Sequence, residues 1–300
     1  MNFNDLYKKC GLCARSCGVD RTAGELGYCA SLSDVMVARA SLHQWEEPII
    51  SGTQGSGTIF FSGCSLGCVY CQNRRISRTP KGEKVSAEQL ADIMLRLEAR
   101  GAHNVNLVTP THYAPTIKES VLKARSRGLI IPVVYNTGSY DAVDTIKMLD
   151  GIVDVYLPDF KYVRNASARE LSSAADYPEV AKSAIVEMHR QHPLPVIEDG
   201  LIKSGVVVRV LLLPMHVAEA KLAVKYLYEK YGDSIYISLM NQYTPMPGMT
   251  SPLDRAVTNA EYDELVEYAM RIGVRNAFIQ EGGTQSESFI PDFDGTGVAP

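Results

Sequence analysis

Residues 58–71 read TIFFSGCSLGCVYC and combine two features that frame the rest of the chain. The first four residues are β-branched or aromatic, which is typical of a buried strand. After a Ser-Gly turn come three cysteines within eight residues. In a (βα) barrel, catalytic groups lie at the carboxyl ends of the strands. The segment therefore predicts a thiolate metal site at the mouth of an α/β fold.

Apolar strands and helical patterns alternate along the chain beyond this segment. After 58–61, strands are expected at 105–108, 132–135, 153–157, 206–213 and 235–239. Helices are expected at 86–100, 114–127, 140–149, 166–190, 217–231 and 259–272. Near-continuous apolar strands between helices indicate a parallel sheet covered on both faces. The expected fold class is therefore α/β, a partial (βα)6-type TIM barrel, with an open Rossmann-like sheet as the alternative.

Local sequence signals mark the start of one of these helices and one additional hairpin. Ser86 and Gln89 are spaced as a capping box, and apolar residues then recur at helical spacing until Gly101. Residues 196–202, with an Asp-Gly turn, resemble a small hairpin inserted between two βα units. Neither feature disturbs the βα alternation.

Three regions follow from this reading. They are a cysteine-rich N-terminal module at 1–50, the barrel at 51–281 and a C-terminal tail at 282–300. Residues 1–50 lack the βα alternation, which is why they are set apart. The tail is rich in Gly, Asp and Ser, but three apolar residues predict that part of it packs on the barrel: Phe289, Ile290 and Phe293.

Charge and hydropathy exclude several classes of function. The net charge of -4 and pI near 5.9 provide no basic field for nucleic acid. Residues 1–9 lack the apolar core of a signal peptide, and no run reaches the roughly 18 apolar residues of a membrane helix. We therefore expect a cytoplasmic protein that binds neither nucleic acid nor membrane.

All seven cysteines lie between Cys10 and Cys71. The odd count, the close spacings and the absence of an export signal argue against disulfides and for metal ligation. Cys64, Cys68 and Cys71 form one set of three. Because a [4Fe-4S] cluster normally takes four cysteines, three leave one iron with a free position at which a substrate can bind.

The CxxxCxxC spacing after a strand, with Tyr70 before the last cysteine, resembles the signature of the radical S-adenosylmethionine (SAM) superfamily. The resemblance implies that Cys64, Cys68 and Cys71 hold a [4Fe-4S] cluster whose open iron binds SAM. It also implies that Tyr70 lies beside the adenine. Three cysteines that bind zinc, or that only pack in the core, are the alternative.

From about Thr58 to Glu281 the chain is similar to pyruvate formate-lyase activating enzymes. This similarity implies that four residues at strand ends line the SAM pocket: Asn136, Thr137, Asp159 and Lys161. It also implies that Arg209, on the fifth strand, reaches toward the methionyl or ribose portion of SAM. In the relatives the Asn136 position is usually Asp and helps to hold a monovalent cation. For Asp159 and Lys161, a surface ion pair is the alternative.

After the second strand the relatives carry a Gly-Gly-Glu segment that receives the methionyl amine. This chain has Thr109-Pro110-Thr111-His112 instead. Thr109 and Thr111 could supply hydroxyls for the same contact, and His112 could transfer protons or complete the cluster's ligand set. Alternatively these residues only close a turn before the next helix.

The first four cysteines form a separate, complete ligand set: Cys10, Cys13, Cys17 and Cys29. Four thiolates suit tetrahedral zinc or a second [4Fe-4S] cluster with no open iron. The surrounding pattern resembles the N-terminal module of proteins related to pyruvate formate-lyase activating enzymes. A relay of electrons, binding of substrate and a purely structural metal all remain open.

The expected enzyme cleaves SAM reductively and uses the 5'-deoxyadenosyl radical for hydrogen abstraction. The family resemblance favours activation of a glycyl-radical enzyme, with radical modification of a small molecule or peptide as the alternative. The alternative outside the enzymes is a non-enzymatic iron-sulfur or zinc protein that transfers electrons. Reduced flavodoxin or ferredoxin is the expected electron donor, and basic residues within 74–84 either dock it or only face water.

Overall fold

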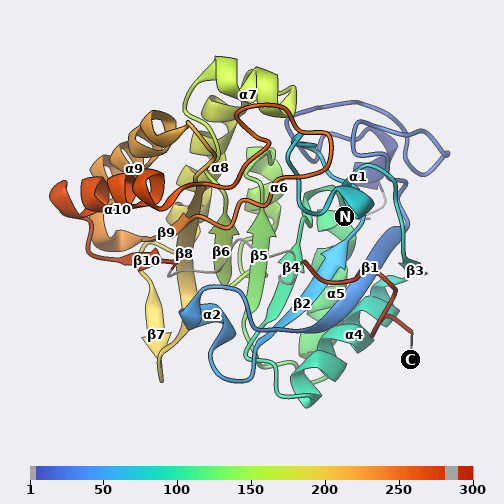
Figure 1. Cartoon of the computed structure of the whole chain (residues 1–300). Coiled ribbons are helices and arrows are strands. Elements are labelled where there is room, and N and C mark those ends of the chain that lie inside the picture. The colour runs from blue at the N-terminus through green and yellow to red at the C-terminus, as the bar shows by residue number, and fades with distance from the viewer. Residues whose placement is uncertain (1–4, 281–289, 300) are drawn as a thin grey trace.

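The computed structural model describes residues 5–280 and 290–299. One large sheet runs through the molecule, with its strands side by side in Figure 1. In chain order the strands are β1 (Val35–His43), β2 (Ser56–Phe61), β3 (Glu83–Val85), β4 (Val105–Val108), β5 (Val133–Thr137), β6 (Val155–Pro158), β7 (Val196–Glu198), β8 (Leu201–Leu211), β9 (Tyr236–Met240) and β10 (Ala277–Ile279).

The spatial order of the sheet is β10-β9-β8-β6-β5-β4-β2-β1-β3, with β7 paired to β8. From β2 to β10 the main-path strands are parallel, whereas β1 is antiparallel to both β2 and β3. Among the described residues the sheet does not close on itself. The six strands expected from sequence are therefore neighbours in chain order, and the prediction of a partial barrel is confirmed.

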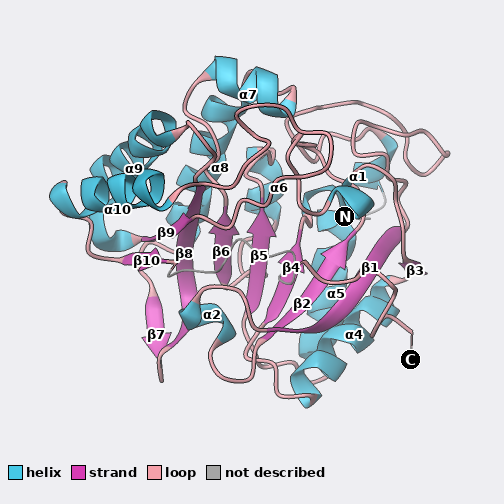
Figure 2. Ribbon diagram, in the orientation of Figure 1, coloured by secondary structure: helices cyan, strands magenta, loops and turns pink. Residues whose placement is uncertain are grey.

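Helices connect successive strands and pack along the sheet, as Figure 2 shows. The helices of eight or more residues are α4 (Ala87–Ala99), α5 (Ala114–Ser126), α7 (Asn165–Ser172), α8 (Tyr177–Gln191), α9 (Val217–Tyr231) and α10 (Asn259–Arg271). The shorter ones are α1 (Asp5–Lys8), α2 (Pro48–Ser51), α3 (Arg74–Ser77), α6 (Val143–Met148) and the 3-10 turns η1 (Thr111–Tyr113) and η2 (Gly232–Ser234). No described helix is long and apolar enough to cross a membrane.

Helix α4 shows why its sequence pattern could be recognised. Ser86 accepts a hydrogen bond from the Gln89 amide, and the Gln89 side chain accepts one from the Ser86 amide, which completes the capping box. The apolar residues of α4 then lie buried against the sheet. The predicted hairpin is also present, because β7 pairs antiparallel with the start of β8 across Asp199-Gly200.

The expectation of one continuous helix at 166–190 is wrong. The chain forms α7 and α8 instead, because Ser173 adopts a left-handed conformation with φ 48° and ends α7. Pro178 then lies in the first turn of α8, where its missing N–H costs nothing. This break leaves the carboxyl end of α7 pointing at the cysteine loop.

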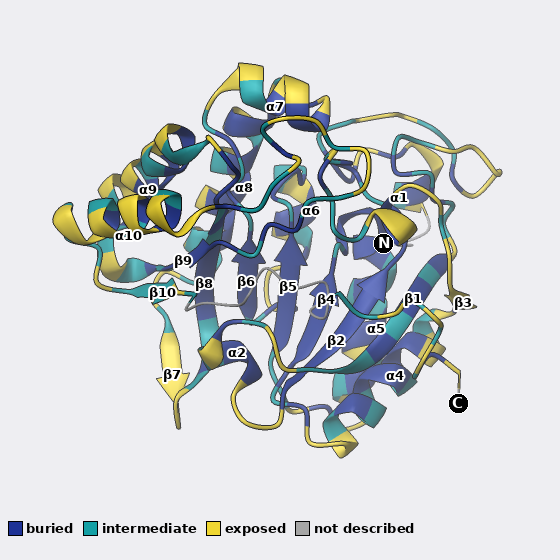
Figure 3. Ribbon diagram, viewed as in Figure 1, coloured by how far each residue is buried: buried dark blue, intermediate teal, exposed yellow. Residues whose placement is uncertain are grey.

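Residues outside the barrel region complete the sheet and the core. β1, from within the first 50 residues, pairs with β2 along most of its length. The described part of the tail returns to the same place, since Phe293 packs edge-on against Phe60 at 5.5 Å and the Ala40 amide donates to the Thr296 carbonyl. Ile290 also lies against the body, whereas Phe289 lies outside the described residues. Figure 3 shows β2, β4, β5 and β6 buried and β7 exposed.

Removing the α4 cap tests the helix assignment. Ser86→Ala should lower the free energy of unfolding by about 1 kcal/mol, because the Gln89 amide loses its acceptor at the helix start. The measurement is the midpoint of urea unfolding followed by circular dichroism. Ser183→Ala is the control, since that exposed hydroxyl bonds only to the Glu179 carbonyl one turn earlier. Equal midpoints for the two variants would contradict the cap.

Candidate active site

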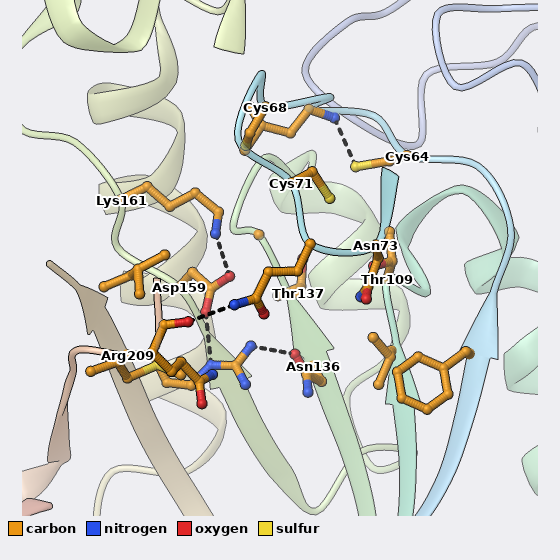
Figure 4. Close-up of a pocket in the computed structure, with 18 of the residues that line it drawn as sticks. Cys64, Cys68, Cys71, Asn73, Thr109, Asn136, Thr137, Asp159, Lys161 and Arg209 are labelled. Atoms are coloured by element: carbon orange, nitrogen blue, oxygen red, sulfur yellow. Dashed lines mark hydrogen bonds and ion pairs between the residues drawn. The ribbon is translucent and has the colours of Figure 1, made fainter. Parts of the chain in front are cut away.

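A cavity of about 220 Å³ opens at the carboxyl ends of the parallel strands (Figure 4). All eleven residues expected from the sequence to form the cluster and SAM site line it: Cys64, Cys68, Tyr70, Cys71, Thr109, Thr111, Asn136, Thr137, Asp159, Lys161 and Arg209. Parallel pairing explains the convergence, because it brings the ends of β2, β4, β5, β6 and β8 to one edge of the sheet.

The three cysteines of the loop after β2 lie at one end of this cavity (Figure 4). The Leu66 amide donates to Cys64 Sγ at 3.4 Å, and Ser172 Oγ donates to Cys68 Sγ at 3.0 Å. Burial, followed by the proximity of Cys64 and Cys68, raises the pKa of the Cys71 thiol to about 12. A metal that binds all three sulfurs as thiolates would relieve this crowding of like charges.

These thiols are free, and within residues 5–280 and 290–299 no group of three or more Cys, His, Asp or Glu side chains has the arrangement of a formed metal site. The donor chemistry nevertheless suits a cluster. Three soft sulfur ligands from one eight-residue loop face one cavity, and sulfur is the ligand that iron-sulfur clusters take.

Arg209, on β8, is the centre of the polar end of the cavity. Its guanidinium donates to Asp159 Oδ1 at 2.7 Å, Asn136 Oδ1 at 2.6 Å and Glu46 Oε2 at 3.3 Å. Lys161 Nζ contacts the other oxygen of Asp159 at 2.7 Å. Two cations and two carboxylates are thus paired inside the cavity, with side-chain exposures between 10% and 17%.

Charge pairing decides the ionisation of this network. Burial opposes ionisation of Asp159, but Arg209 and Lys161 outweigh it and hold the pKa of this carboxyl below its ordinary value. Burial raises the pKa of Glu46, and Arg209 and Asn106 offset only part of that rise. Of these two carboxyl groups, Asp159 is therefore the one that more readily stays ionised. The alternative of a surface ion pair is wrong for Asp159 and Lys161, since both side chains are largely buried in the cavity.

The first of the two threonines after β4 takes an unusual backbone conformation. Thr109 has φ 59°, in the left-handed region that a β-branched residue rarely adopts. Its amide donates to the Asn136 carbonyl, which fixes the turn. Thr111 Oγ1 lies 3.4 Å from Thr137 Oγ1, which in turn donates to the buried carboxylate of Asp141 at 2.7 Å. Strain of this kind is typical of functional turns.

The expectation that His112 could transfer protons or complete the ligand set is wrong. Its Nε2 lies 2.8 Å from the Ser62 carbonyl oxygen, and its side chain does not line the cavity. Burial, with the Arg21 charge adding to it, lowers the pKa of His112 to about 3. A neutral imidazole thus stabilises the turn before the cysteine loop.

Tyr70 belongs to a chain of hydroxyl groups that ends at the cysteine loop. Its hydroxyl lies 2.7 Å from that of Tyr162, which lies 2.7 Å from Ser172 Oγ. Ser172 then donates to Cys68 Sγ. The ring of Tyr70 also meets Tyr243 edge-on at 6.2 Å. The aromatic position therefore packs at the cavity wall and orders the loop beside it.

Several cavity residues have no counterpart in the predictions. They are His43, Trp45, Glu46, Gln72, Asn73, Gln242, Tyr243 and Pro291, among others. Glu46 is the most consequential, because it pairs with Arg209 and accepts a hydrogen bond from Asn106 at 3.0 Å. It lies between β1 and α2, within a segment that the sequence sets apart from the barrel, so no strand-end signal marked it.

The N-terminal cysteines gather in a separate place. Cys10, Cys13 and Cys29 are buried, whereas Cys17 is exposed. Burial raises the pKa of Cys13 to about 12, an amide hydrogen bond from Arg15 lowers it, and the other three cysteines raise it further. Cys13 therefore lies near enough to the other three cysteines for their thiolate charges to disfavour its own ionisation.

Comparison with known proteins agrees with this site. Residues 58–192 match the Radical SAM superfamily model. A protein of Methanocaldococcus jannaschii named "Uncharacterized protein MJ0674" is 29% identical over 276 residues, which cover 88% of this chain and 75% of the relative.

Solved structures share the fold. Native anSMEcpe with bound AdoMet has a TM-score of 0.52 and 14% identity, with 72% of this chain and 61% of that chain covered. Streptococcus suis SuiB bound to its precursor peptide SuiA has a TM-score of 0.52 and 12% identity, with 74% and 47% covered. Methylornithine synthase (PylB) has a TM-score of 0.50 and 16% identity, with 89% and 68% covered. The chain thus spans less than two thirds of the first two structures.

Fold and site together agree with this match: residues 58–192 are similar to a radical SAM superfamily domain. This domain begins at β2 and includes the cysteine loop and the ends of β4, β5 and β6.

Breaking the buried network gives a pH-dependent prediction. Asp159→Asn should lower the free energy of unfolding at pH 7 by about 3–5 kcal/mol, because Arg209 and Lys161 lose their shared carboxylate. The folded pKa of Asp159 is depressed, so its contribution is present above the unfolded value of about 3.9 and is lost as pH falls through the folded value. The difference between wild type and variant should therefore shrink below about pH 4.

Urea unfolding at a series of pH values measures this difference. Asp150→Asn is the control, because its partner Arg190 lies at the surface and already pairs with Glu187. A loss for Asp159→Asn that stays constant from pH 7 to acid would contradict the assignment of the charged state.

Proposed function

We propose that this chain cleaves SAM reductively and uses the resulting radical to abstract hydrogen from a protein or peptide. The observation that carries the proposal is the cavity itself, which holds three thiols at one end and a balanced set of buried charges at the other. When bound, a [4Fe-4S] cluster would supply the electron that splits the sulfonium of SAM. Cys64, Cys68 and Cys71 are the residues that would hold it.

The remaining residues of the cavity suit a zwitterionic nucleoside. Lys161 and Arg209 offer cations for a carboxylate, while Asp159 and Glu46 keep those cations in place. Thr109 and Thr111 line the same cavity, and their hydroxyls would form hydrogen bonds with the methionyl amine and the ribose. The side chain of Tyr70 forms an apolar wall suited to a purine.

Two observations favour a protein or peptide as the hydrogen donor. Trp45 lines the cavity with 57% of its surface exposed, so an aromatic side chain stands at the mouth. Among the structures that share this fold, SuiB was solved with its precursor peptide. Activation of a glycyl-radical enzyme, by abstraction from one of its glycines, is the member of this class that the sequence resemblance favours. Modification of a smaller peptide is the second candidate.

A closed electron carrier is the competing class, and it requires a fourth protein ligand beside the three cysteines. His112 was the candidate for that role, and it bonds to the Ser62 carbonyl instead. Apart from these three cysteines, His43 is the cysteine or histidine among the described residues that line the cavity, and its ring packs edge-on against Phe60 at 6.1 Å. This arrangement supports a cluster with an open iron.

Reduced flavodoxin or ferredoxin remains our proposal for the electron donor. Basic residues of 74–84 only partly face water, since Arg78 donates to the Gly67 carbonyl at 2.8 Å and Arg74 to the Pro247 carbonyl at 3.3 Å. Docking of an acidic partner would therefore use a basic segment that already touches the cysteine loop.

Arg21 supports a metal at the N-terminal cysteines. Its side chain is 1% exposed, and within the described ranges no carboxylate pairs with it. It donates instead to the carbonyls of Ser31, Leu32 and His112 and lies 3.8 Å from Cys10 Sγ. A buried cation needs an anion close by. Four metal-bound thiolates would supply that negative charge, whether the metal is zinc or a second [4Fe-4S] cluster.

The test of the proposed reaction is SAM cleavage by the reconstituted chain. After anaerobic loading with iron and sulfide, dithionite and SAM should yield 5'-deoxyadenosine, measured by liquid chromatography. Cys68→Ala should reduce the yield to that of the iron-free protein, because two sulfurs cannot hold the cluster. Wild type that takes up iron but forms no 5'-deoxyadenosine would overturn the proposal in favour of the carrier.

Metal content separates the two readings of the N-terminal site. Two clusters predict about eight irons per chain, whereas one cluster and a structural metal predict about four irons with one zinc. Elemental analysis of the reconstituted chain gives both numbers. About four irons with no zinc or other metal would contradict a metal site at Cys10, Cys13, Cys17 and Cys29.

A further inference from the structure

Arg15, between the second and third N-terminal cysteines, reaches across to the cluster loop. Its guanidinium donates to four backbone carbonyls: Ser65 at 3.0 Å, Leu66 at 3.2 Å, Ser172 at 3.0 Å and Ser173 at 2.6 Å. Two of these carbonyls belong to the cluster loop and two to the carboxyl end of α7. Because carbonyls at a helix end carry partial negative charge, a guanidinium is well placed between them.

Arg78 holds the next carbonyl of the same loop. It donates to the Gly67 carbonyl at 2.8 Å and to the Tyr28 hydroxyl at 3.0 Å. A Cβ at Gly67, which has φ +67°, would clash with this guanidinium. Three consecutive carbonyls between Cys64 and Cys68 therefore accept hydrogen bonds from two arginines.

Tyr28 connects both arginines to the N-terminal cysteines. The guanidinium carbon of Arg15 lies 3.7 Å from the centre of its ring, and that of Arg78 lies 4.9 Å from it. The Tyr28 amide lies 3.4 Å from Cys17 Sγ, to which it donates, and Cys29 follows directly in the chain. A shift of Cys17 or Cys29 would therefore move the ring on which the arginines rest.

The N-terminal module also touches the cluster loop at its beginning. A Cβ at Gly63, which has φ +89°, would clash with the Ser31 hydroxyl and lie 2.7 Å from the Cys29 carbonyl oxygen. At the other side of the loop, the Val69 amide donates to the Leu171 carbonyl of α7. The loop is thus held between the N-terminal cysteines and the end of α7.

We propose that Arg15, Tyr28 and Arg78, called here the arginine clasp, position the Cys64–Cys71 loop and couple it to the metal state of the N-terminal cysteines. The inference rests on the proposed function, because it assigns a role beside that site. Both arginines contact only backbone carbonyls of the loop, so they are positioning residues. Their positive charges and hydrogen bonds should raise the reduction potential of a cluster held there, since reduction adds negative charge.

The first test compares Arg15→Gln with Lys8→Gln in the full chain. Lys8 lies in the same N-terminal segment but pairs only with Asp5 at the surface, so its variant controls for the loss of one charge. Deuterium exchange of the metal-free protein should be several-fold faster for Arg15→Gln in peptides covering 64–71, and unchanged for Lys8→Gln. In the reconstituted protein, the cluster's midpoint potential, followed by electron paramagnetic resonance, should be lower for Arg15→Gln.

Arg78→Gln is a second, independent variant and should shift both readouts in the same direction. If Arg15→Gln and Arg78→Gln both have the deuterium exchange and the midpoint potential of Lys8→Gln, the clasp is overturned.

Cys17→Ser tests the coupling to the N-terminal cysteines in the reconstituted protein. Its effect on the midpoint potential and that of Arg15→Gln should not add in the double variant, because Cys17 reaches the loop through Tyr28 and the Arg15 guanidinium that rests on it. A double variant equal to the sum of the two single shifts would overturn the coupling.

The same preparations separate this inference from the proposed function. Wild type that forms no 5'-deoxyadenosine, together with faster exchange in Arg15→Gln, would overturn SAM cleavage while supporting the clasp. Wild type that forms 5'-deoxyadenosine, together with Arg15 and Arg78 variants identical to Lys8→Gln, would overturn the clasp alone.

Discussion

Parallel pairing of consecutive strands is the constraint on which the other features of this molecule depend. It brings the ends of β2, β4, β5, β6 and β8 to one edge, although these strands are separated by long stretches of chain. Helices between the strands stabilise the sheet by burying its apolar side chains. Polar residues that would be costly in such a core are tolerated at the strand ends, where they meet around a cavity.

Charges inside that cavity are acceptable because each has a partner. Arg209 lies between Asp159 and Glu46, and Lys161 pairs with Asp159. The buried Arg21 differs, because its partners are carbonyls and the sulfur of Cys10. The positive charge of Arg209 is therefore balanced by the protein's own carboxylates. We attribute the balance of the Arg21 charge to metal-bound thiolates.

Sequence patterns predicted the features that have a period or a fixed spacing. The apolar strands and the Ser86 cap were predicted from their spacing. The family resemblance, not a pattern, predicted that Asn136, Asp159 and Arg209 belong to one pocket, and all three line the cavity. The break between α7 and α8 was missed: a serine does not indicate the left-handed conformation that Ser173 adopts, and Pro178, which marks the first turn of α8, was not used as a signal. The role of Glu46 could not be predicted either, because it lies in an irregular segment. No sequence period fixes the direction in which a loop side chain points.

The tight approach at Gly63 restricts how this chain can be divided. Because no side chain fits between that position and the segment from Cys29 to Ser31, the N-terminal region and the barrel meet through touching backbones at the very start of the cluster loop. Such a junction cannot be exchanged like an independent domain. A chimera that joins this cysteine region to another barrel would need a glycine at the position that corresponds to Gly63. Without it, the two backbones would have to move apart.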